Sequence, residues 1–361
     1  MIEPVRRIDA EVVPFLARGC AILGTGGGGE VYTGSLMSLQ ALEEFGPIDV
    51  VTLDDLPDDG LLMPIGMMGA PTVGIEKIPS GREGVVLRDH VERLTGRRVV
   101  AAMPSEIGGS NGLLPVAWAA QLGLPLVDAD SMGRAFPELQ QVSQHVVGRR
   151  PDLIVLTDVH GNLVTLGATS GEWAERVGRA VTVAFGGSSA MADFIMPVGE
   201  ARGAVIEGSI SRAVAIGRAV SDSADPLGAL VEAVGAVRLI EGRVVDVERR
   251  TTGGFARGTV VVDGTGEDRG RALRIEIQNE NLVAFDDGAV RACVPDLITV
   301  VDAVTADAIA TEMLRYGQRV AVVAFPCDPL WRTARGIETA GPRAFGYDFD
   351  YVPIEVAGAR A

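Results

Sequence analysis

Polar and charged side chains follow three predicted strands, at the points where those strands end. They are Glu76 and Lys77, then Glu106 and Asn111, then Asp128, Asp130 and Arg134. In an open parallel sheet, ligands bind beside the carboxyl ends of the strands, so we expect these groups to face one pocket. A carboxylate there can activate water as a general base, and an arginine can clamp a substrate carboxylate. The pattern predicts an enzyme with catalytic residues Lys77, Glu76, Glu106, Asp128 and Asp130.

Each of these groups also has a structural interpretation. Glu76 and Lys77 would form a surface ion pair, Asp128 and Arg134 would pair inside the protein, and Asn111 would cap a helix. Lys77, however, is the single lysine among 32 lysines and arginines. A lysine offers a compact ammonium whose pKa can fall on burial, whereas a guanidinium stays charged. We therefore expect Lys77 to stabilise or protonate a substrate ring nitrogen.

The glycine-rich stretch Gly24–Gly29 matches the dinucleotide pattern GxGxxG, but a predicted helix precedes it where that fingerprint requires a strand. NAD is therefore not expected. Consecutive glycines still let a ligand approach main-chain N–H groups, and a helix that begins after the loop would favour an anion there. A tight turn between two helices is the alternative. The predicted substrate-binding residues are Gly26, Gly27, Gly28, Thr72, Asn111 and Arg134.

The histidines and cysteines show no metal-binding spacing. The three cysteines are far apart, which excludes a disulfide framework or a cysteine zinc site. His145 and His160 flank a predicted strand and could reach the same sheet edge as the acids. A divalent metal such as zinc therefore stays open as a cofactor, with Glu106, Asp130, His145 and His160 as candidate ligands.

Helices and apolar strands alternate over the first 200 residues. The predicted strands are 49–53, 61–67, 98–103, 124–127 and 153–157, and the predicted helices are 8–23, 32–45, 85–94, 112–122 and 171–180. Near-continuous apolar strands between helices favour a mostly parallel sheet that is covered on both faces. This part is predicted to be an α/β domain.

The pattern changes after about residue 203. A helix is predicted over 210–220, then strands over 243–247, 258–262, 272–277, 282–285 and 297–301, then helical and strand patterns over 306–316 and 319–325. Turn dipeptides such as Asp263-Gly264 separate the strands. We expect a smaller β-rich domain of residues 206–305, inserted in an α/β domain of residues 1–205 and 306–361.

Composition restricts the partners. The net charge of −16 repels phosphate backbones and anionic lipid, so neither nucleic acid nor membrane is an expected partner. No apolar run reaches the roughly 18 residues of a membrane span, and the charged N-terminus lacks the features of a signal peptide. We expect a cytoplasmic protein with a small-molecule substrate. A homo-oligomer is left open.

Five stretches of the chain together resemble the S-methyl thiohydantoin desulfurase family, often found near hydantoin utilisation proteins. They are LGTGGGGEVYTG (23–34), GMMGAPTVGIEK (66–77), EIGGSNGL (106–113), LPLVDADSMGRAFPELQ (124–140) and PLWRTARGIETAGPRAFGYDFDYVPI (329–354). The resemblance runs the length of the chain. It implies a Rossmann-like domain with a smaller β-rich domain of swivelling type.

The resemblance also implies a hydrolase activity, the cleavage of a carbon–sulfur bond in an S-methylated thiohydantoin from ergothioneine degradation. Methanethiol and a hydantoin would be the products. Such a substrate would bear a propionate, which Arg134 or the glycine loop would hold, while Glu106 or Asp130 activates water. Two other functions stay open: an ATP-dependent ring amidohydrolase of the hydantoinase or oxoprolinase type, and a non-catalytic metabolite-binding protein.

Overall fold

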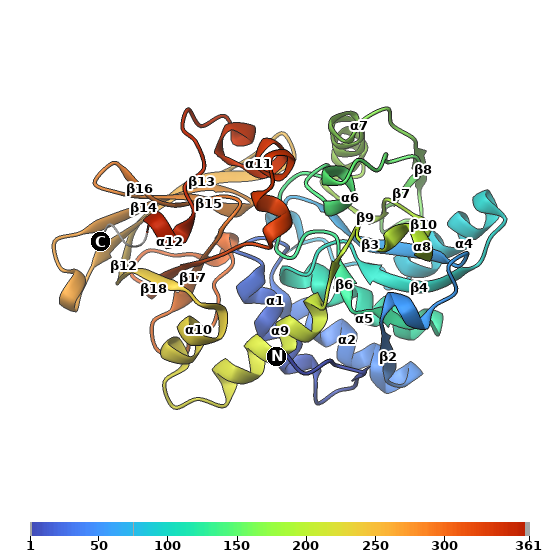
Figure 1. The fold of residues 1–361 in the computed structure, drawn as a ribbon, viewed down its shortest axis with the longest axis horizontal. Coiled ribbons are helices and arrows are strands. Elements are labelled where there is room, and N and C mark those ends of the chain that lie inside the picture. Colours follow the sequence, from blue (N-terminus) through green and yellow to red (C-terminus); the bar gives the residue numbers. More distant parts are fainter. Residues whose placement is uncertain (1, 75, 358–361) are drawn as a thin grey trace.

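The computed structural model describes residues 2–74 and 76–357, which form two large sheets with helices around them (Figure 1). The first sheet consists of β1 (Arg7–Ile8), β2 (Ile48–Val51), β3 (Leu61–Gly69), β4 (Val99–Pro104), β5 (Leu126–Val127), β7 (Ile154–Thr157), β8 (Leu163–Leu166), β9 (Ser188–Ala192) and β10 (Met196–Pro197). The second consists of β12 (Val237–Thr252), β13 (Phe255–Gly264), β14 (Ala272–Gln278), β15 (Glu280–Asp286), β16 (Ala289–Cys293), β17 (Leu297–Asp302) and β18 (Arg319–Phe325). A small separate sheet joins β6 (Ala129–Asp130) and β11 (Ile206–Glu207).

Helices surround the first sheet and connect it to the second. They are α1 (Val13–Leu23), α2 (Val31–Phe45), α3 (Pro71–Gly74), α4 (Glu83–Thr95), α5 (Leu114–Leu122), α6 (Ser143–Val146), α7 (Gly171–Ala184), α8 (Val198–Ala201), α9 (Ser209–Ser221), α10 (Pro226–Val234), α11 (Ala334–Ala340) and α12 (Ile354–Ala357). Six 3₁₀ turns lie at Leu53–Asp55, Gly109–Gly112, Gly266–Asp268, Thr311–Met313, Pro329–Arg332 and Pro342–Phe345. No helix among the described residues is long and apolar enough to cross a membrane.

The first sheet is mixed, so the prediction of a mostly parallel, Rossmann-like sheet is wrong. Its spatial order is β1-β2-β5-β4-β3-β9-β7-β8, and only the neighbours β2, β5, β4 and β3 run parallel. β9, β7, β8 and β1 each pair antiparallel, as does β10 with β3. A run of apolar residues indicates that a strand is buried on both faces, but it does not show whether the strand runs parallel or antiparallel to its neighbours. Direction depends on the connections, and the short link from β7 to β8 forces an antiparallel pair.

The second sheet is antiparallel throughout, in the order β16-β15-β14-β13-β12-β18-β17. β18 lies between β12 and β17, so the sheet is completed only after the chain has left and returned to it. The architecture is two joined sheets, one mixed and one antiparallel, and the prediction of a swivelling-type insertion in a Rossmann-like domain is wrong. The domain limits of 1–205 with 306–361, and 206–305, stay predictions.

One predicted helix is also wrong. Residues 306–316 form turns and the short 3₁₀ segment Thr311–Met313, because tertiary contacts hold this stretch irregular. Ala306 has a positive φ of 56°, which interrupts a helix, and the Thr311 N–H donates to the Gly26 carbonyl. The helix predicted over 8–23 begins only at Val13, since Ile8 belongs to β1, and the other predicted helices up to α9 exist with ends shifted by a few residues.

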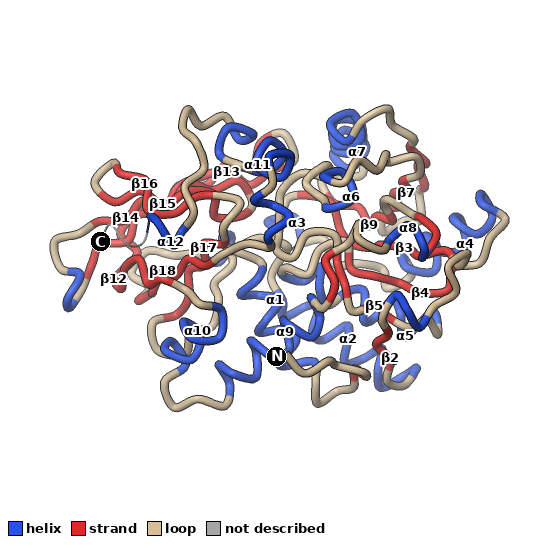
Figure 2. The backbone as a smooth tube through the Cα atoms, in the orientation of Figure 1, coloured by secondary structure: helices blue, strands red, loops and turns tan. Residues whose placement is uncertain are grey.

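Close packing of α1 on α9 fixes the position of the glycine-rich loop. A Cβ on Gly19 would lie 1.8 Å from the Ala213 carbonyl oxygen, and one on Gly217 would lie 1.9 Å from the Phe15 carbonyl oxygen. Only glycine permits two helix backbones to approach this closely. Because α1 ends at Leu23, this contact anchors the loop that follows. Figure 2 shows that loops gather between the two groups of strands.

Candidate active site

A cavity of about 320 Å³ lies where residues from both sheets meet. The first sheet contributes the ends of β3 and β4, with Gly28 and Gly29 beside them. The second contributes Asn279 and Glu280 from the junction of β14 and β15. Six methionines line the wall, namely Met37, Met67, Met68, Met132, Met191 and Met313. The site is mostly apolar with a few polar groups, as small-molecule sites usually are.

Glu106 follows β4 and projects into this cavity, although it is only 4% exposed. One carboxylate oxygen accepts from Asn111 Nδ2 at 3.0 Å, and the other accepts from the Phe136 N–H at 3.1 Å. Burial raises the pKa of Glu106 to about 8, against the lowering effect of these two hydrogen bonds. Glu106 is therefore suited to hold or release a proton near neutral pH.

Asn111 positions Glu106 rather than capping a helix. Its Oδ1 accepts from the Met67 N–H at 2.8 Å, and its Nδ2 donates to the Met67 carbonyl at 3.3 Å as well as to Glu106. The side chain thus continues the hydrogen-bonding pattern of β3 and fixes the carboxylate against the strand. α5 instead begins after Leu113, without a side-chain cap.

Glu280 is the second buried carboxyl group of the cavity lining, and the sequence analysis missed it. It begins β15 and is 2% exposed, and its Oε2 has no hydrogen-bond partner among the described residues. Burial, followed by the negative charge of Glu106, raises its pKa well above the usual value. The sequence offered one signal, the polar run Gln278-Asn279-Glu280-Asn281 between two apolar strands. The structure shows that all four of these residues are buried.

The glycine-rich loop brings these two carboxyl groups close to one stretch of backbone. A Cβ on Gly27 would lie 1.9 Å from Glu280 Oε1, and one on Gly28 would lie 2.7 Å from Glu106 Oε1. Gly28 lines the cavity, whereas Gly26 packs against Thr311. The first turn of α2 is capped by its own Glu30, which accepts from the Tyr32 N–H at 2.8 Å. The glycines therefore leave space for the two carboxyl groups. The Tyr32 N–H at the start of α2 is already bonded to Glu30, so it is not available to an anionic ligand.

Arg134 lies behind the carboxyl pair and does not line the cavity. Its guanidinium donates to the carbonyls of Ala135, Pro295 and Asp296 and to Thr25 Oγ1 at 2.8–2.9 Å. Its charge lowers the pKa of Glu106 and of Glu280. The structure therefore gives Arg134 a supporting place beneath both carboxyl groups, not a direct contact with a substrate in the cavity.

The two aspartates predicted beside these groups lie outside the cavity lining. Asp130 Oδ2 accepts from the N–H groups of Ile107, Met132 and Gly133 at 2.8–3.0 Å, and burial raises its pKa to about 7. It orders the loops on which Glu106 and Met132 stand. Asp128 accepts from the Ser211 N–H at 3.0 Å and lines a different hollow near the start of α9.

Of the remaining predicted residues, only Lys77 lines the cavity. Its ammonium donates to the Phe185 carbonyl and forms no ion pair with any described residue. Glu76 is exposed and absent from the lining, and Thr72 contacts Thr251 at 3.2 Å beside the site. Glu76 therefore faces solvent, whereas Lys77 lines the cavity.

The four metal-ligand candidates do not meet. His145 on α6 lies 3.6 Å from Glu172, and His160 is exposed in the turn before β8. Neither lines the cavity. Within residues 2–74 and 76–357, no three His, Cys, Asp or Glu side chains come together in a group that could hold a metal ion.

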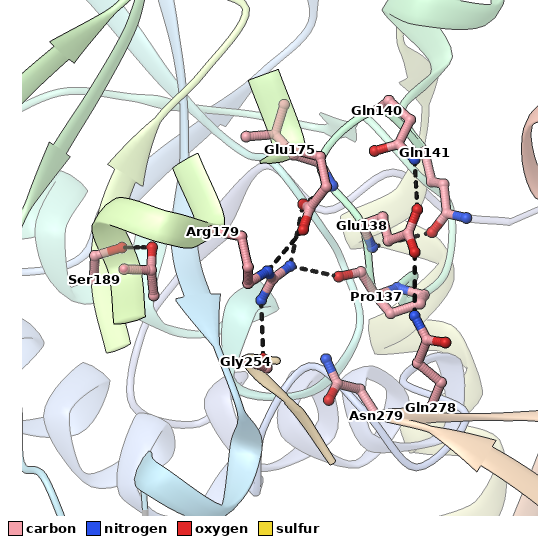
Figure 3. A network of polar contacts seen from close by, with 12 residues as sticks. Pro137, Glu138, Gln140, Gln141, Glu175, Arg179, Ser189, Gly254, Gln278 and Asn279 are labelled. Carbon is pink, nitrogen blue, oxygen red and sulfur yellow. Dashed lines mark hydrogen bonds and ion pairs between the residues drawn. The ribbon is translucent and has the colours of Figure 1, made fainter. Parts of the chain in front are cut away.

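A network of polar contacts ties the second sheet to the cavity wall (Figure 3). Arg179 on α7 donates to Glu175 at 2.7 Å, to the Pro137 carbonyl at 2.8 Å and to the Gly254 carbonyl at 3.2 Å. Glu138 accepts from Gln278 Nε2 at 3.2 Å. Because Gly254 lies between β12 and β13, these contacts hold the hairpin of the second sheet against the first.

Fold and site together define a two-sheet protein with a ligand cavity at the junction and two buried carboxyl groups in it. The chain matches the descriptions "S-Me-THD-like, N-terminal domain" over residues 11–168 and "S-Me-THD-like, C-terminal domain" over residues 169–354. It belongs to the S-methyl thiohydantoin desulfurase-like family, which confirms the resemblance seen in the sequence.

One solved structure and the curated proteins complete the comparison. A crystal structure of a protein from Chromobacterium violaceum is similar, with 23% sequence identity and a TM-score of 0.80. The match covers 97% of this chain and 100% of that one, and it shows a shared fold. No curated protein matches the chain.

Proposed function

We propose that the protein hydrolyses the carbon–sulfur bond of an S-methylated thiohydantoin, releasing methanethiol and leaving a hydantoin. One observation carries the proposal: Glu106 and Glu280 come from different sheets and lie buried in one cavity, both with a raised pKa. Titratable groups with environments of this kind mark acid–base centres. The family membership supports the substrate class.

The reaction needs one group that removes a proton from water and another that gives a proton to sulfur. Because the charge of Glu106 opposes ionisation of Glu280, the pair holds a proton near neutral pH. The ionised carboxylate accepts a proton as water attacks the C=N carbon. The carboxylic acid then donates a proton to the departing methanethiolate. The second proton of water passes from the added hydroxyl to the ring nitrogen, so the oxygen remains as the ring carbonyl and methanethiol leaves as a neutral thiol.

The methionine-rich wall suits the flat ring and its methylthio group. Thioethers are polarisable and adapt to irregular shapes, and sulfur packs favourably against planar rings. Met67 and Met68 lie on β3 next to the strand end that Asn111 holds, while Met132 and Met313 come from other segments of the wall. Such a lining would hold the ring by contact area and leave proton transfer to the two carboxyl groups.

Lys77 is available for an acidic arm of the substrate. It forms no ion pair with any described residue, whereas the other cation of the lining, Arg179, is already paired with Glu175. Lys77 lies beside Phe185 and Gly186, beyond the end of β3, whereas Asn111 holds Glu106 at Met67. We therefore assign Lys77 to a substrate carboxylate and no longer to a ring nitrogen.

The test is turnover in ¹⁸O-labelled water without any nucleotide. S-methyl thiohydantoin propionate is the substrate, and the corresponding hydantoin is the control compound. The proposal predicts methanethiol release and one ¹⁸O atom in the ring carbonyl of the product. Opening of the hydantoin ring, or turnover that depends on ATP, would instead favour a ring amidohydrolase. Saturable binding with no product would favour a metabolite-binding protein.

A further inference from the structure

A serine and an aspartate meet at the floor of the cavity, next to Glu106. Ser105 follows β4 and lines the cavity at 3% exposure, and its Oγ donates a hydrogen bond to Asp193 Oδ1. Asp193 follows β9 and is 1% exposed. β3 runs between these two strands: the Ser105 N–H donates to the Ile65 carbonyl and the Asp193 N–H donates to the Pro64 carbonyl. Backbone pairing on both sides of β3 therefore fixes the contact.

Asp193 has few partners for so deeply buried a carboxyl group. No described cation forms an ion pair with it, and Ser105 is its one side-chain hydrogen-bond partner among the described residues. Burial raises its pKa to about 6, and the bond from Ser105 lowers it, so it can take the hydroxyl proton at neutral pH. A hydroxyl in hydrogen-bond contact with a base is the arrangement of an activated nucleophile.

We propose that Ser105 is the nucleophile that first displaces methanethiol, with Asp193 as the residue that accepts its proton. The inference rests on the proposed function and deepens it. It divides the hydrolysis into two additions at the same carbon. Direct attack by water would need only the Glu106–Glu280 pair. The route through Ser105 also gives a role to the Ser105–Asp193 pair.

The steps balance without a further reactant. Ser105 Oγ forms a bond to the C=N carbon, and its proton passes to Asp193. The C–S bond then breaks, and the carboxylic acid of the Glu106–Glu280 pair protonates methanethiolate. Water, activated by the carboxylate of that pair, attacks the same carbon. The C–Oγ bond breaks, the hydroxyl recovers its proton from Asp193, and the hydantoin leaves with the oxygen of water as its carbonyl.

The first experiment uses a probe that needs no substrate. Wild-type protein is treated with diisopropyl fluorophosphate, and labelled peptides are mapped by mass spectrometry. Ser105 should carry the label, and the labelling rate should rise with pH through about 6, the pKa of Asp193. Asp193→Asn should lose this pH dependence. The control is Ser189→Ala, since Ser189 is equally buried and its hydroxyl lies 2.7 Å from the Thr182 hydroxyl, with no hydrogen bond to a carboxylate among the described residues.

The second experiment quenches wild-type turnover with acid and measures intact mass. An adduct equal to the substrate minus methanethiol should appear on Ser105 and be absent from Ser105→Ala. If Ser105→Ala releases methanethiol at the wild-type rate and no adduct forms, the nucleophile is wrong while the proposed function stands. If the probe labels Ser105 but no methanethiol is released, the proposed function is wrong and the displacement step falls with it, while Ser105 remains a reactive nucleophile for another substrate. Should Ser105→Ala not fold, Ser105→Cys replaces it, and its thiol should carry the adduct.

Discussion

Two buried carboxyl sites in this protein are built in opposite ways. Asp296, fully buried at the end of the second sheet, accepts from the N–H groups of Cys327 and Ile354 and pairs with Arg332 at 2.8 Å. Its remaining partner is the hydroxyl of Tyr351. Glu280 is as deeply buried, yet one of its oxygens has no partner among the described residues. Asp296 therefore fastens the C-terminal segment, whereas Glu280 is left with bonding capacity that faces a cavity.

The comparison distinguishes carboxylates that stabilise the fold from carboxylates that can transfer protons in a reaction. A buried charge that is paired and fully hydrogen-bonded stabilises local structure, and its removal leaves its partners unpaired. A buried carboxyl group without a cation costs stability and stays protonated more easily. Glu106 belongs to the second type, since both of its hydrogen-bond donors are neutral. Five substitutions, ordered from the largest expected effect to the smallest, test this contrast.

Glu106→Gln and Glu280→Gln should each lower kcat for methanethiol release by roughly 10²- to 10⁴-fold, the usual contribution of a general acid or base. The fold should be unchanged, because glutamine keeps the shape and removes a buried charge. Steady-state kinetics and circular dichroism measure the two quantities. Asp268→Asn is the control: it removes another buried carboxylate, bound to Arg271 far from the cavity, and should leave kcat unchanged. Normal turnover by either Gln variant would remove that carboxyl group from the mechanism.

Asp296→Asn should act on stability. Loss of this charge weakens the contact with Arg332, which keeps Glu355 at 2.8 Å, so the cost is that of a hydrogen bond to a charged group, about 1.5–3 kcal/mol of the free energy of unfolding. Urea denaturation measures the change, and kcat of the folded fraction should stay near that of the wild type. Asp287→Asn, in the exposed turn between β15 and β16, should shift stability by less than about 0.5 kcal/mol. A stable Asp296→Asn protein would contradict the anchoring role.

Lys77→Met should raise KM for an acidic substrate while leaving kcat nearly unchanged. A hydrogen bond to a charged group contributes about 1.5–3 kcal/mol, which corresponds to roughly 10- to 150-fold in KM. The methyl ester of the same substrate should show no such change, and this comparison is the internal control. An equal effect on acid and ester would mean that Lys77 acts on the ring or only on the fold.

Gly27→Ala should disturb the carboxyl pair from the backbone side. The added Cβ would fall 1.9 Å from Glu280 Oε1, and overpacking of this kind costs about 1–3 kcal/mol. Activity should fall as Glu280 is displaced. Gly199→Ala on α8 is the matched control, because Gly199 lies outside the cavity lining and a Cβ there would meet its nearest neighbour, Asp58, at an ordinary 3.4 Å. Wild-type activity of Gly27→Ala would show that the close approach is not required.

The sequence alone could identify one half of the site. Glu106, Asn111 and Lys77 follow strand ends in a local pattern, and the structure places all three in the cavity wall. The pattern could not show that Asp128 and Asp130 lie outside that wall, because the period of two in a strand does not say which of its two faces meets the pocket. Nor could it place Glu280, which reaches the site only because a second sheet docks on the first.

The fold, too, could be predicted only in part from the sequence. Apolar periodicity located most helices and strands, but it carries no information on strand direction, so the mixed first sheet was missed. The β-rich character of residues 243–301 was visible from its turns and alternation. The position of β18 between β12 and β17 was not, because pairing between distant strands depends on tertiary contacts.

The most direct test is an infrared titration of the protein with ¹³C-labelled glutamate from pH 5 to pH 10. The account predicts a carboxylic acid C=O band that persists at pH 7. Because the pKa of Glu106 is raised to about 8, part of this band should vanish as the pH rises through that value. In the Glu106→Gln, Glu280→Gln double variant, the band at pH 7 should shrink to the part that comes from Glu312, whose pKa burial raises to about 7. A spectrum in which every glutamate is ionised by pH 6 would contradict the claim that this cavity holds an acid–base pair.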